Sequence, residues 1–332
     1  PLWGQRNEGL FHPPKAQAAR FRALEWNVEN LYDTLHDAGF DDREFLPDAE
    51  RRWNTPRYFH KQSSLAKTIL AAGGLQPVDL VALCEVENDS VMHFLCHRTR
   101  LARLGYEYLV THSADRRGID VALLYQPETF ALLHSETYRV PYDSLRERPT
   151  RDLLHAAGRL PFGDTLDVFV VHFPSRRGGA TISEPYRLRA AGILRHLADS
   201  IARCRHTPRL LAMGDFNDEP HNASVSRVLA PTFAELTSHA TPFPAEGHDD
   251  IEGSYYFRGE WSRIDQILVS PTLLSPTMKF HTTPQSVHLL AFPPLLETLG
   301  RGTLSKPFRT YLGPFYHGGI SDHLPLCVDF SY

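Results

Sequence analysis

The sequence predicts a mixed domain of the α/β or α+β class, on three observations. Apolar runs of strand length recur along the chain, and several are nearly continuous, as expected for strands covered on both faces. Amphipathic segments typical of helices lie between these runs, most clearly at residues 184–203. The runs at 106–113 and 119–125 follow each other too closely for a helical crossover, so antiparallel hairpins must contribute.

The individual elements follow from these patterns. The expected strands are residues 21–28, 79–86, 106–113, 119–125, 130–140, 165–173, 208–216, 263–270 and 324–330, and the expected helices are 60–72, 90–104 and 184–203. Residues 1–20 are polar and contain prolines, and we expect an N-terminal arm there. Residues 21–332 are expected to form a single domain, with surface insertions near 141–164 and 271–317, where many prolines and glycines gather.

The composition of the 332 residues excludes several classes of protein. Hydrophobic residues make up 42% and charged residues 22%, which excludes a disordered chain, a coiled coil and a collagen-like repeat. No apolar run approaches the length of a membrane span, so none is expected. The formal net charge is -4, so a nucleic-acid partner would need a local basic surface.

The cysteines give little sign of a metal or of an oxidising compartment. Cys84, Cys96, Cys204 and Cys327 show no CxxC or CxxH spacing, which argues against a structural zinc site. Cys84 and Cys327 lie inside apolar runs, where cysteine usually serves as a small core residue. The sequence begins at Pro1, which fits a removed signal peptide and a trimmed chain equally well, so the cellular location stays open.

Polar and ionisable residues collect where the predicted strands begin or end. They are Asn27, Glu85, Asp120, His172, Asp215, Asn217, Asp265, Asp322 and His323. Each alone has an ordinary structural explanation, since aspartate and asparagine often stabilise turns. Strand ends in a layered sheet converge on one rim, however, and such rims are where sites are built. The set as a whole therefore predicts one polar site.

The carboxylates of this rim require a counter-charge, because like charges in one cleft repel each other. A divalent metal supplies it, and oxygen ligands without cysteine favour Mg²⁺, with Mn²⁺ or Ca²⁺ as alternatives, over zinc. Metal, carboxylates, histidines and asparagines together suit hydrolysis of a phosphate ester. Arg176 and Arg177, in a glycine-rich loop after His172, are placed to hold a substrate phosphate, and a solvated loop explains them equally well.

The chain resembles the endonuclease/exonuclease/phosphatase superfamily, in a bacterial branch, from residue 21 to residue 332. The resemblance rests on the motifs WNVEN, ALCEVEN, RGIDVALLY, VVHFPSRRGG, MGDFNDEP, SRIDQILVS and GGISDHLPL, which stand in the superfamily's order. The superfamily includes deoxyribonucleases, apurinic/apyrimidinic endonucleases, inositol polyphosphate 5-phosphatases and bacterial sphingomyelinases. The resemblance implies a four-layered α/β sandwich, with two facing, mixed, largely antiparallel sheets and helices on the outside. It also implies a divalent-metal-dependent phosphoester hydrolase.

The resemblance assigns metal and water chemistry to part of the rim. Glu85 matches the metal-binding glutamate, Asn27 the asparagine near metal and phosphate, and Asp322 a metal-site aspartate. Asp215 matches the aspartate that orients or deprotonates the attacking water, and Asn217 its neighbour in the same motif. Side chains two residues apart on an extended segment share a face, so Asp215 and Asn217 are expected to hold water and phosphate together.

The resemblance assigns proton and phosphate chemistry to the rest of the rim. His323 matches the histidine that contacts the scissile phosphate, and Asp265 the aspartate that orients it and favours its charge. His172 stands where the deoxyribonuclease and sphingomyelinase branches have a second histidine, the expected leaving-group acid, and Asp120 is its expected partner. The apurinic endonuclease branch has a tyrosine at that position, so this chain departs from that branch.

We expect a monomeric phosphodiesterase of the nuclease type, because His172 offers a proton donor for a poor alkoxide leaving group. A phosphatase, or a phosphodiesterase acting on phospholipids or sugar phosphates, is the alternative within the superfamily. An inactive phospholigand-binding protein of the same fold predicts gaps in the residue set, and none is seen. Five aromatic residues are candidates to stack on bases or to pack against the sandwich: Phe292, Phe308, Tyr311, Phe315 and Tyr316.

Overall fold

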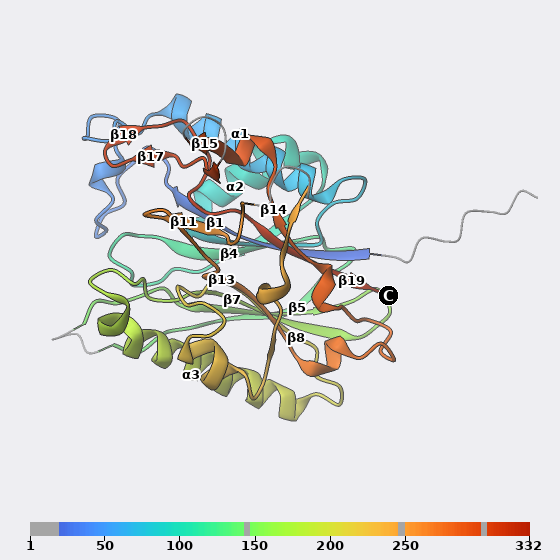
Figure 1. Cartoon of the computed structure of the whole chain (residues 1–332). Coiled ribbons are helices and arrows are strands. Elements are labelled where there is room, and N and C mark those ends of the chain that lie inside the picture. The colour runs from blue at the N-terminus through green and yellow to red at the C-terminus, as the bar shows by residue number, and fades with distance from the viewer. Residues whose placement is uncertain (1–19, 143–146, 245–249, 300–303) are drawn as a thin grey trace, which may run out of the picture.

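Two β-sheets packed face to face form the centre of the computed structural model (Figure 1). The structure describes residues 20–142, 147–244, 250–299 and 304–332, so the predicted N-terminal arm lies outside the described residues except for its last residue. Helices α1 (Thr55–Gly73) and α2 (Asp89–Arg98) cover one sheet, and α3 (Ala180–Cys204) covers the other. The predicted four-layered arrangement is confirmed.

The first sheet holds seven strands, most of them antiparallel. Their order is β10 (Thr241–Phe243), β14 (Val287–Leu290), β19 (Leu326–Ser331), β1 (Arg20–Leu31), β2 (Leu80–Val86), β4 (Asp120–Tyr125) and β3 (Glu107–Val110). The pairs β1–β2 and β10–β14 are parallel, and the other pairs are antiparallel. Strands β1 and β19, from opposite ends of the described chain, lie side by side.

The second sheet holds six strands with one parallel pair. Their order is β5 (Ala131–Tyr138), β6 (Leu153–Arg159), β7 (Thr165–His172), β8 (Leu210–Asp215), β13 (Asp265–Val269) and β9 (Ala234–Glu235). Only β7 and β8 run parallel among the described pairs of this sheet. This parallel pair matters for function, because it ends at the predicted site residues His172 and Asp215.

Short elements complete the described chain. Three hairpins are formed by β11 (Tyr255–Phe257) with β12 (Glu260–Ser262), β15 (Leu296–Leu299) with β16 (Leu304–Pro307), and β17 (Tyr311–Leu312) with β18 (Phe315–Tyr316). The 3-10 helices are Arg43–Phe45, Arg100–Arg103, Thr237–His239, Pro271–Leu274, Pro284–Ser286 and Pro293–Leu295, and Ser224–Leu229 forms a π-helix. None of the helices in the described ranges is long and apolar enough to cross a membrane.

Strand β7 shows why the central strands read as continuous apolar runs. Val168 and Val170 belong to the core cluster between the two sheets, whereas Phe169 and Val171 pack in a second cluster with α3. Successive side chains of a strand point to opposite faces, so a strand covered on both sides needs apolar residues at every position. On α3, Leu194 is fully buried in the second cluster, as its helical stripe predicts.

The two predicted insertions contain sheet strands and are therefore only partly insertions. The segment 141–164 includes β6, which lies between β5 and β7, and the segment 271–317 includes β14 of the first sheet. Strand β6 has the sequence LLHAAGR, with no β-branched residue and only one aromatic ring, a histidine. Its pairing with two neighbouring strands, rather than its own composition, makes it a strand.

The buried state of Cys84 and Cys327 confirms their prediction as core residues. All four cysteines are free, and Cys204 is the exposed one among them. Of the five aromatic residues considered as base-stacking candidates, Phe315 is exposed, whereas Tyr311 is buried against Trp53 and Tyr316. These aromatic residues near the C-terminal end of the chain therefore contribute more to packing than to a surface on which bases could stack.

Gly214 permits the close approach of β7 and β8 directly before Asp215, and we expect Gly214→Ala to destabilise the fold by about 3 kcal/mol or more. Its φ is 144°, and an added Cβ would lie 1.9 Å from the carbonyl oxygen of Val171. Urea denaturation measures the effect. Gly192→Ala is the matched control, since Gly192 lies in α3 with open space around it and should gain about 0.5–1 kcal/mol. Equal stability of both variants would contradict this account.

Candidate active site

Asp215, the last residue of β8, is the centre of a row of three buried side chains. His172 ends the parallel strand β7 directly beside it, and Asp265 begins the antiparallel strand β13 on its other side. Their exposed fractions are 2% for Asp215, 4% for His172 and 0% for Asp265. The ladder of the second sheet therefore fixes the spacing of all three, and the sequence prediction that strand ends converge on one rim is confirmed for them.

Asn27 reaches this row from the facing sheet. Its Nδ2 donates a hydrogen bond to Oδ2 of Asp215 at 3.0 Å, and its Oδ1 accepts one from the backbone N–H of Glu29 at 3.0 Å. Both ends of the amide are thus engaged within the protein. The structure gives Asn27 the role of positioning Asp215, and the predicted roles at metal and phosphate stay predictions.

His323 lies against Asp265 as an ion pair. Its Nδ1 is 2.7 Å from Oδ2 of Asp265, which also accepts a hydrogen bond from the Ser254 hydroxyl. The indole N–H of Trp26 donates to the His323 carbonyl at 2.9 Å, and the Tyr255 ring lies with its centroid 4.7 Å from that of His323. The imidazole is thus held by Asp265 and the Tyr255 ring, and the His323 backbone is held by Trp26.

The charges around His323 and Asp215 raise the pKa of both groups. Burial by itself lowers the pKa of His323, but Asp265, followed by Asp322 and Asp215, raises it to about 10. Burial, with the nearby Asp265, raises the pKa of Asp215 to about 7, although His323 opposes the shift. At neutral pH, His323 is therefore an imidazolium, and Asp215 can accept a proton with little driving force required.

Asn217 comes to Asp215 through a turn and not along an extended segment, so the predicted extended geometry is wrong. Its φ is 49°, its backbone N–H donates to Oδ1 of Asp215 at 2.8 Å, and its Nδ2 donates to the Phe173 carbonyl at 3.0 Å. Asparagine tolerates the left-handed conformation and often bonds its neighbours' backbone in turns. Asn217 therefore contacts the Asp215 carboxylate through its backbone, while its side chain binds the Phe173 carbonyl.

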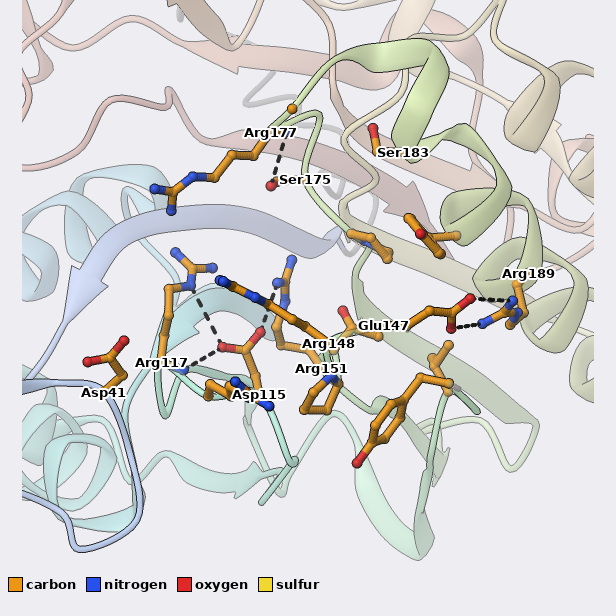
Figure 2. A pocket seen from close by; sticks show the side chains of 18 of the residues that line it. Asp41, Asp115, Arg117, Glu147, Arg148, Arg151, Ser175, Arg177, Ser183 and Arg189 are labelled. Carbon is orange, nitrogen blue, oxygen red and sulfur yellow. Dashed lines mark hydrogen bonds and ion pairs between the residues drawn. The ribbon is translucent and has the colours of Figure 1, made fainter. Parts of the chain in front are cut away.

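Arg176 holds this turn. Its Nε donates to the Asn217 carbonyl at 2.7 Å, and its Nη2 donates to Oδ1 of Asn222 at 2.8 Å. The next residue of the turn, Asp218, forms a buried ion pair with Arg187 at 2.7 Å. Two nitrogens of the Arg176 guanidinium thus have a structural role, and its phosphate role stays a prediction. Arg177 is exposed and reaches over an open cavity (Figure 2).

His172 is neutral in this environment. Its Nε2 lies 3.5 Å from Oδ2 of Asp215, and its pKa is lowered well below the usual value by burial and by Arg151, Arg117 and His323. An imidazole of this kind offers a hydrogen bond rather than a readily available acidic proton. The role of His172 as leaving-group acid stays a prediction, and it requires that the ring first take up a proton.

Asp120 is bound elsewhere, which corrects its predicted pairing with His172. Its Oδ1 accepts hydrogen bonds from the Thr111 hydroxyl at 2.6 Å and from the Ser113 backbone N–H at 2.9 Å. Burial raises the pKa of Asp120, and these two donors lower it in part. The carboxylate fixes the segment that enters β4, because it satisfies the backbone of the preceding loop.

A model of the Endonuclease/Exonuclease/phosphatase family matches residues 23–331, nearly the entire chain. The chain belongs to this family. A search of the curated proteins finds no match.

Solved structures share the fold at low sequence identity. An endonuclease/exonuclease/phosphatase family protein from Bacteroides thetaiotaomicron aligns with a TM-score of 0.59 and 14% identity, covering 95% of this chain and 99% of that one. A mannosyl-6-phosphatase from the same bacterium gives 0.59 and 14%, covering 94% of this chain and 100% of that one. TDP2 of D. rerio, complexed with a single-strand DNA product, gives 0.57 and 14%, covering 95% and 100%.

Family members typically require a divalent metal, and two sets of residues in this chain are candidates for it. Donor atoms of Asp215, Asp265 and His323 lie within 4.8 Å of one another. A protonated imidazole has no lone pair for a metal, however, and Nδ1 of His323 is already bound to Asp265. This set is better described as a hydrogen-bonded Asp265–His323 pair with Asp215 beside it.

Glu85 fits a metal better. Its side chain is 13% exposed, one oxygen accepts a hydrogen bond from the Asn30 backbone N–H at 2.9 Å, and the other lies 3.8 Å from Arg117. A partly open carboxylate with one oxygen so weakly paired suits Mg²⁺ or Mn²⁺. Asp322, the other predicted ligand, is paired with Arg309 at 2.9 Å. Its metal role stays a prediction.

The backbone around Glu85 is strained in a way that marks functional sites. Among the described residues, six other than glycine have a positive φ, and four of them are Glu29, Asn30, Glu85 and Asn217. Such conformations cost about 1–3 kcal/mol each and persist where the surroundings enforce them. Glu29 and Asn30 end the WNVEN motif, so this motif bends the chain around the site.

Two buried ionisable residues at the site were missed by the sequence analysis. Lys61 of α1 donates from Nζ to the Glu29 carbonyl and, at 2.8 Å, to the Thr310 hydroxyl, and so ties the WNVEN turn to a distant segment. Glu25 of β1 is fully buried, and neither carboxyl oxygen has a hydrogen-bond partner among the described residues. Burial, with Asp265 and Asp215 nearby, raises the pKa of Glu25 well above its usual value. The sequence did offer a signal for both residues, because Lys61 is a charged residue on the apolar stripe of a helix and Glu25 is one inside the apolar run of a strand.

Asp265→Asn should lower the pKa of His323 from about 10 toward the ordinary value near 6.5, because the imidazolium loses the carboxylate in contact with it. NMR titration of the His323 ring measures this. The fold should persist, since asparagine keeps the shape. Asp48→Asn, at an exposed position, is the control and should leave the titration unchanged. An unaltered His323 pKa in Asp265→Asn would contradict the assigned pairing.

Glu25→Gln should stabilise the metal-free protein increasingly as the pH rises. A carboxyl group whose folded pKa is raised contributes stability that is full below its unfolded pKa, near 4.5, and is lost as the pH rises toward the folded pKa. Glutamine cannot ionise, so it avoids that loss. Melting temperatures in EDTA at pH 5 and pH 8 measure the widening difference, with exposed Glu128→Gln as the control. A difference that shrinks with pH would show that Glu25 is charged in the fold.

Proposed function

We propose that this chain hydrolyses phosphate esters by direct attack of a water molecule that Asp215 deprotonates. The observation that carries the proposal is the buried cluster in which His323, an imidazolium, lies close to Asp215, a carboxylate with a pKa of about 7. A proton acceptor beside a fixed cation is what attack on a phosphate requires. Membership of the family supports the same class of reaction.

The chain's own residues divide the work as follows. Asp265 occupies Nδ1 of His323 and thereby leaves the other ring N–H to donate to a phosphoryl oxygen. Asn27 and the backbone N–H of Asn217 hold Asp215 by one oxygen each, so its orientation toward the water is fixed. Asp215 must be ionised and His323 protonated, which places the active range between about pH 7 and about pH 10.

Glu85 would hold a divalent metal. When bound, the metal neutralises charge on the phosphoryl oxygens. The fit rests on the partly exposed carboxylate and on its single weak ion pair, with Arg117 at 3.8 Å.

We propose a phosphodiester as the preferred substrate class, now on grounds other than a protonated His172. A neutral His172 with Nε2 near Asp215 can donate to an ester oxygen without being an acid. An open cavity lies beside the loop after β7, close to the strand end that carries His172, and we propose that it gives room for a group on the far side of the phosphate. TDP2 with its DNA product supports a nucleic-acid substrate, whereas the mannosyl-6-phosphatase supports the alternative of a monoester.

The purified chain should release nitrophenol from bis(p-nitrophenyl) phosphate with Mg²⁺ or Mn²⁺ and stop in excess EDTA, and Asp215→Asn should lower turnover by about 10²–10⁴-fold. The reason is that asparagine cannot accept the proton of the attacking water. Glu128→Gln, an exposed change of the same size, is the matched control. Turnover that survives EDTA, or an Asp215→Asn variant as fast as the control, would refute the proposed chemistry. Release of nitrophenol from p-nitrophenyl phosphate, but not from bis(p-nitrophenyl) phosphate, would favour the phosphatase alternative.

A further inference from the structure

A cavity of about 930 Å³ opens between the loop after β7 and the segments around Arg117 and Arg148 (Figure 2). It lies beside the row of His172, Asp215 and Asp265, which we call the catalytic row. Its volume lies within the range of sites that bind nucleotide-sized molecules. The family's catalytic residues are absent from its lining, so the cavity is a neighbour of the catalytic row and not the row itself.

The lining of this cavity is rich in arginine. Six arginines face four carboxylates, which leaves an excess of two positive charges in a chain whose formal net charge is -4. The arginines are Arg116, Arg117, Arg148, Arg151, Arg177 and Arg189. Planar guanidinium groups suit phosphate recognition, because they donate two parallel hydrogen bonds. We call this feature the arginine cavity.

Half of these arginines are already paired within the protein. Arg189 binds Glu147 through both of its terminal nitrogens, at 2.6 and 3.1 Å, and Arg151 donates to Asp115 at 3.2 Å. Arg117 lies 3.7 Å from Asp115. These pairs fix the cavity wall and engage two of its four carboxylates, Asp115 and Glu147.

Arg116, Arg148 and Arg177 are different. All three are exposed, and in the part of the chain that the structure describes their guanidinium groups make no ion pair with a carboxylate. Figure 2 shows Arg148 and Arg177 gathered with Arg117 and Arg151 on one side of the cavity, away from the Glu147–Arg189 pair. Cations gathered without counter-charges repel each other, and an anion relieves that repulsion.

The arginine cavity is joined to the catalytic row through a shared atom. The Phe173 carbonyl accepts a hydrogen bond from Nη2 of Arg151 at 2.7 Å and another from Nδ2 of Asn217 at 3.0 Å. On the same side, Arg117 of the cavity lies 3.8 Å from Glu85. The row of His172, Asp215 and Asp265 and the arginine cavity are therefore neighbours in the fold.

We propose that the arginine cavity binds a second phosphate group of the substrate, next to the one that is hydrolysed, and that Arg148 and Arg177 are its principal ligands. This rests on the proposed function for the position of the first phosphate. The second phosphate belongs either to the next unit of a nucleic-acid backbone or to a small bisphosphate, and the chemistry recognised is the same in both cases. Selectivity then comes from a local basic surface, since the chain as a whole repels polyanions.

The test measures binding and needs no turnover. Isothermal titration calorimetry of the metal-free, full chain compares thymidine 3′,5′-bisphosphate with thymidine 5′-monophosphate, and fructose 1,6-bisphosphate with fructose 6-phosphate. We expect at least one bisphosphate to bind about tenfold more tightly than its monophosphate at low salt. The pair with the larger ratio of bisphosphate affinity to monophosphate affinity shows whether the second phosphate belongs to a nucleotide or to a sugar. In Arg148→Ala/Arg177→Ala the ratio should fall to about one.

Arg203→Ala/Arg227→Ala is the matched control, because it removes two exposed arginines outside the cavity and changes the net charge equally. It should keep the wild-type ratio. Equal binding of each bisphosphate and its monophosphate by the wild type would overturn the inference, as would an equal loss in both double variants. Hydrolysis of bis(p-nitrophenyl) phosphate by the same wild-type sample, with Mg²⁺, reports separately on the proposed function. A failure of the second-phosphate proposal can thereby be told apart from a failure of the proposed function.

Discussion

The contact between His323 and Asp265 is the interaction on which the rest of the site depends. It places a positive charge in a region that also buries Asp215 and Glu25, and without it three carboxyl groups would face each other in the core. Burying uncompensated carboxylates is costly, so the imidazolium is a structural requirement as well as a chemical tool. One proton on His323 thus sets the charge states of its neighbours.

The fold itself was largely readable from the sequence, because its strands are covered on both faces. Runs such as 165–173 need apolar residues at every position, which makes them conspicuous, and β7 forms at Thr165–His172. Strand β6 escaped notice because its residues have little strand preference and tertiary pairing decides their conformation. Composition alone could not separate it from the loops on either side.

The candidate site was predictable in its membership and in one pairing, that of His323 with Asp265, but not in its other contacts. Strand ends placed Asp215, His172 and Asp265 together, and Asn27 and His323 joined them. The remaining pairings depend on distances of a few tenths of an ångström, and a sequence carries no such information. Asp120 was therefore given His172 as a partner, whereas the structure pairs it with Thr111 and Ser113.

The hydrogen bond from Asn27 to Asp215 crosses from one sheet to the other, and Trp26 is bonded to a residue 297 positions away. The reactive centre is consequently a product of late assembly. Neither sheet alone, nor a nascent chain that lacks the segment from Asp265 to His323, holds the groups in register. Contacts of such long sequence separation cost loop-closure entropy before they form. The proposed hydrolytic activity therefore depends on the finished tertiary structure and cannot reside in either sheet alone.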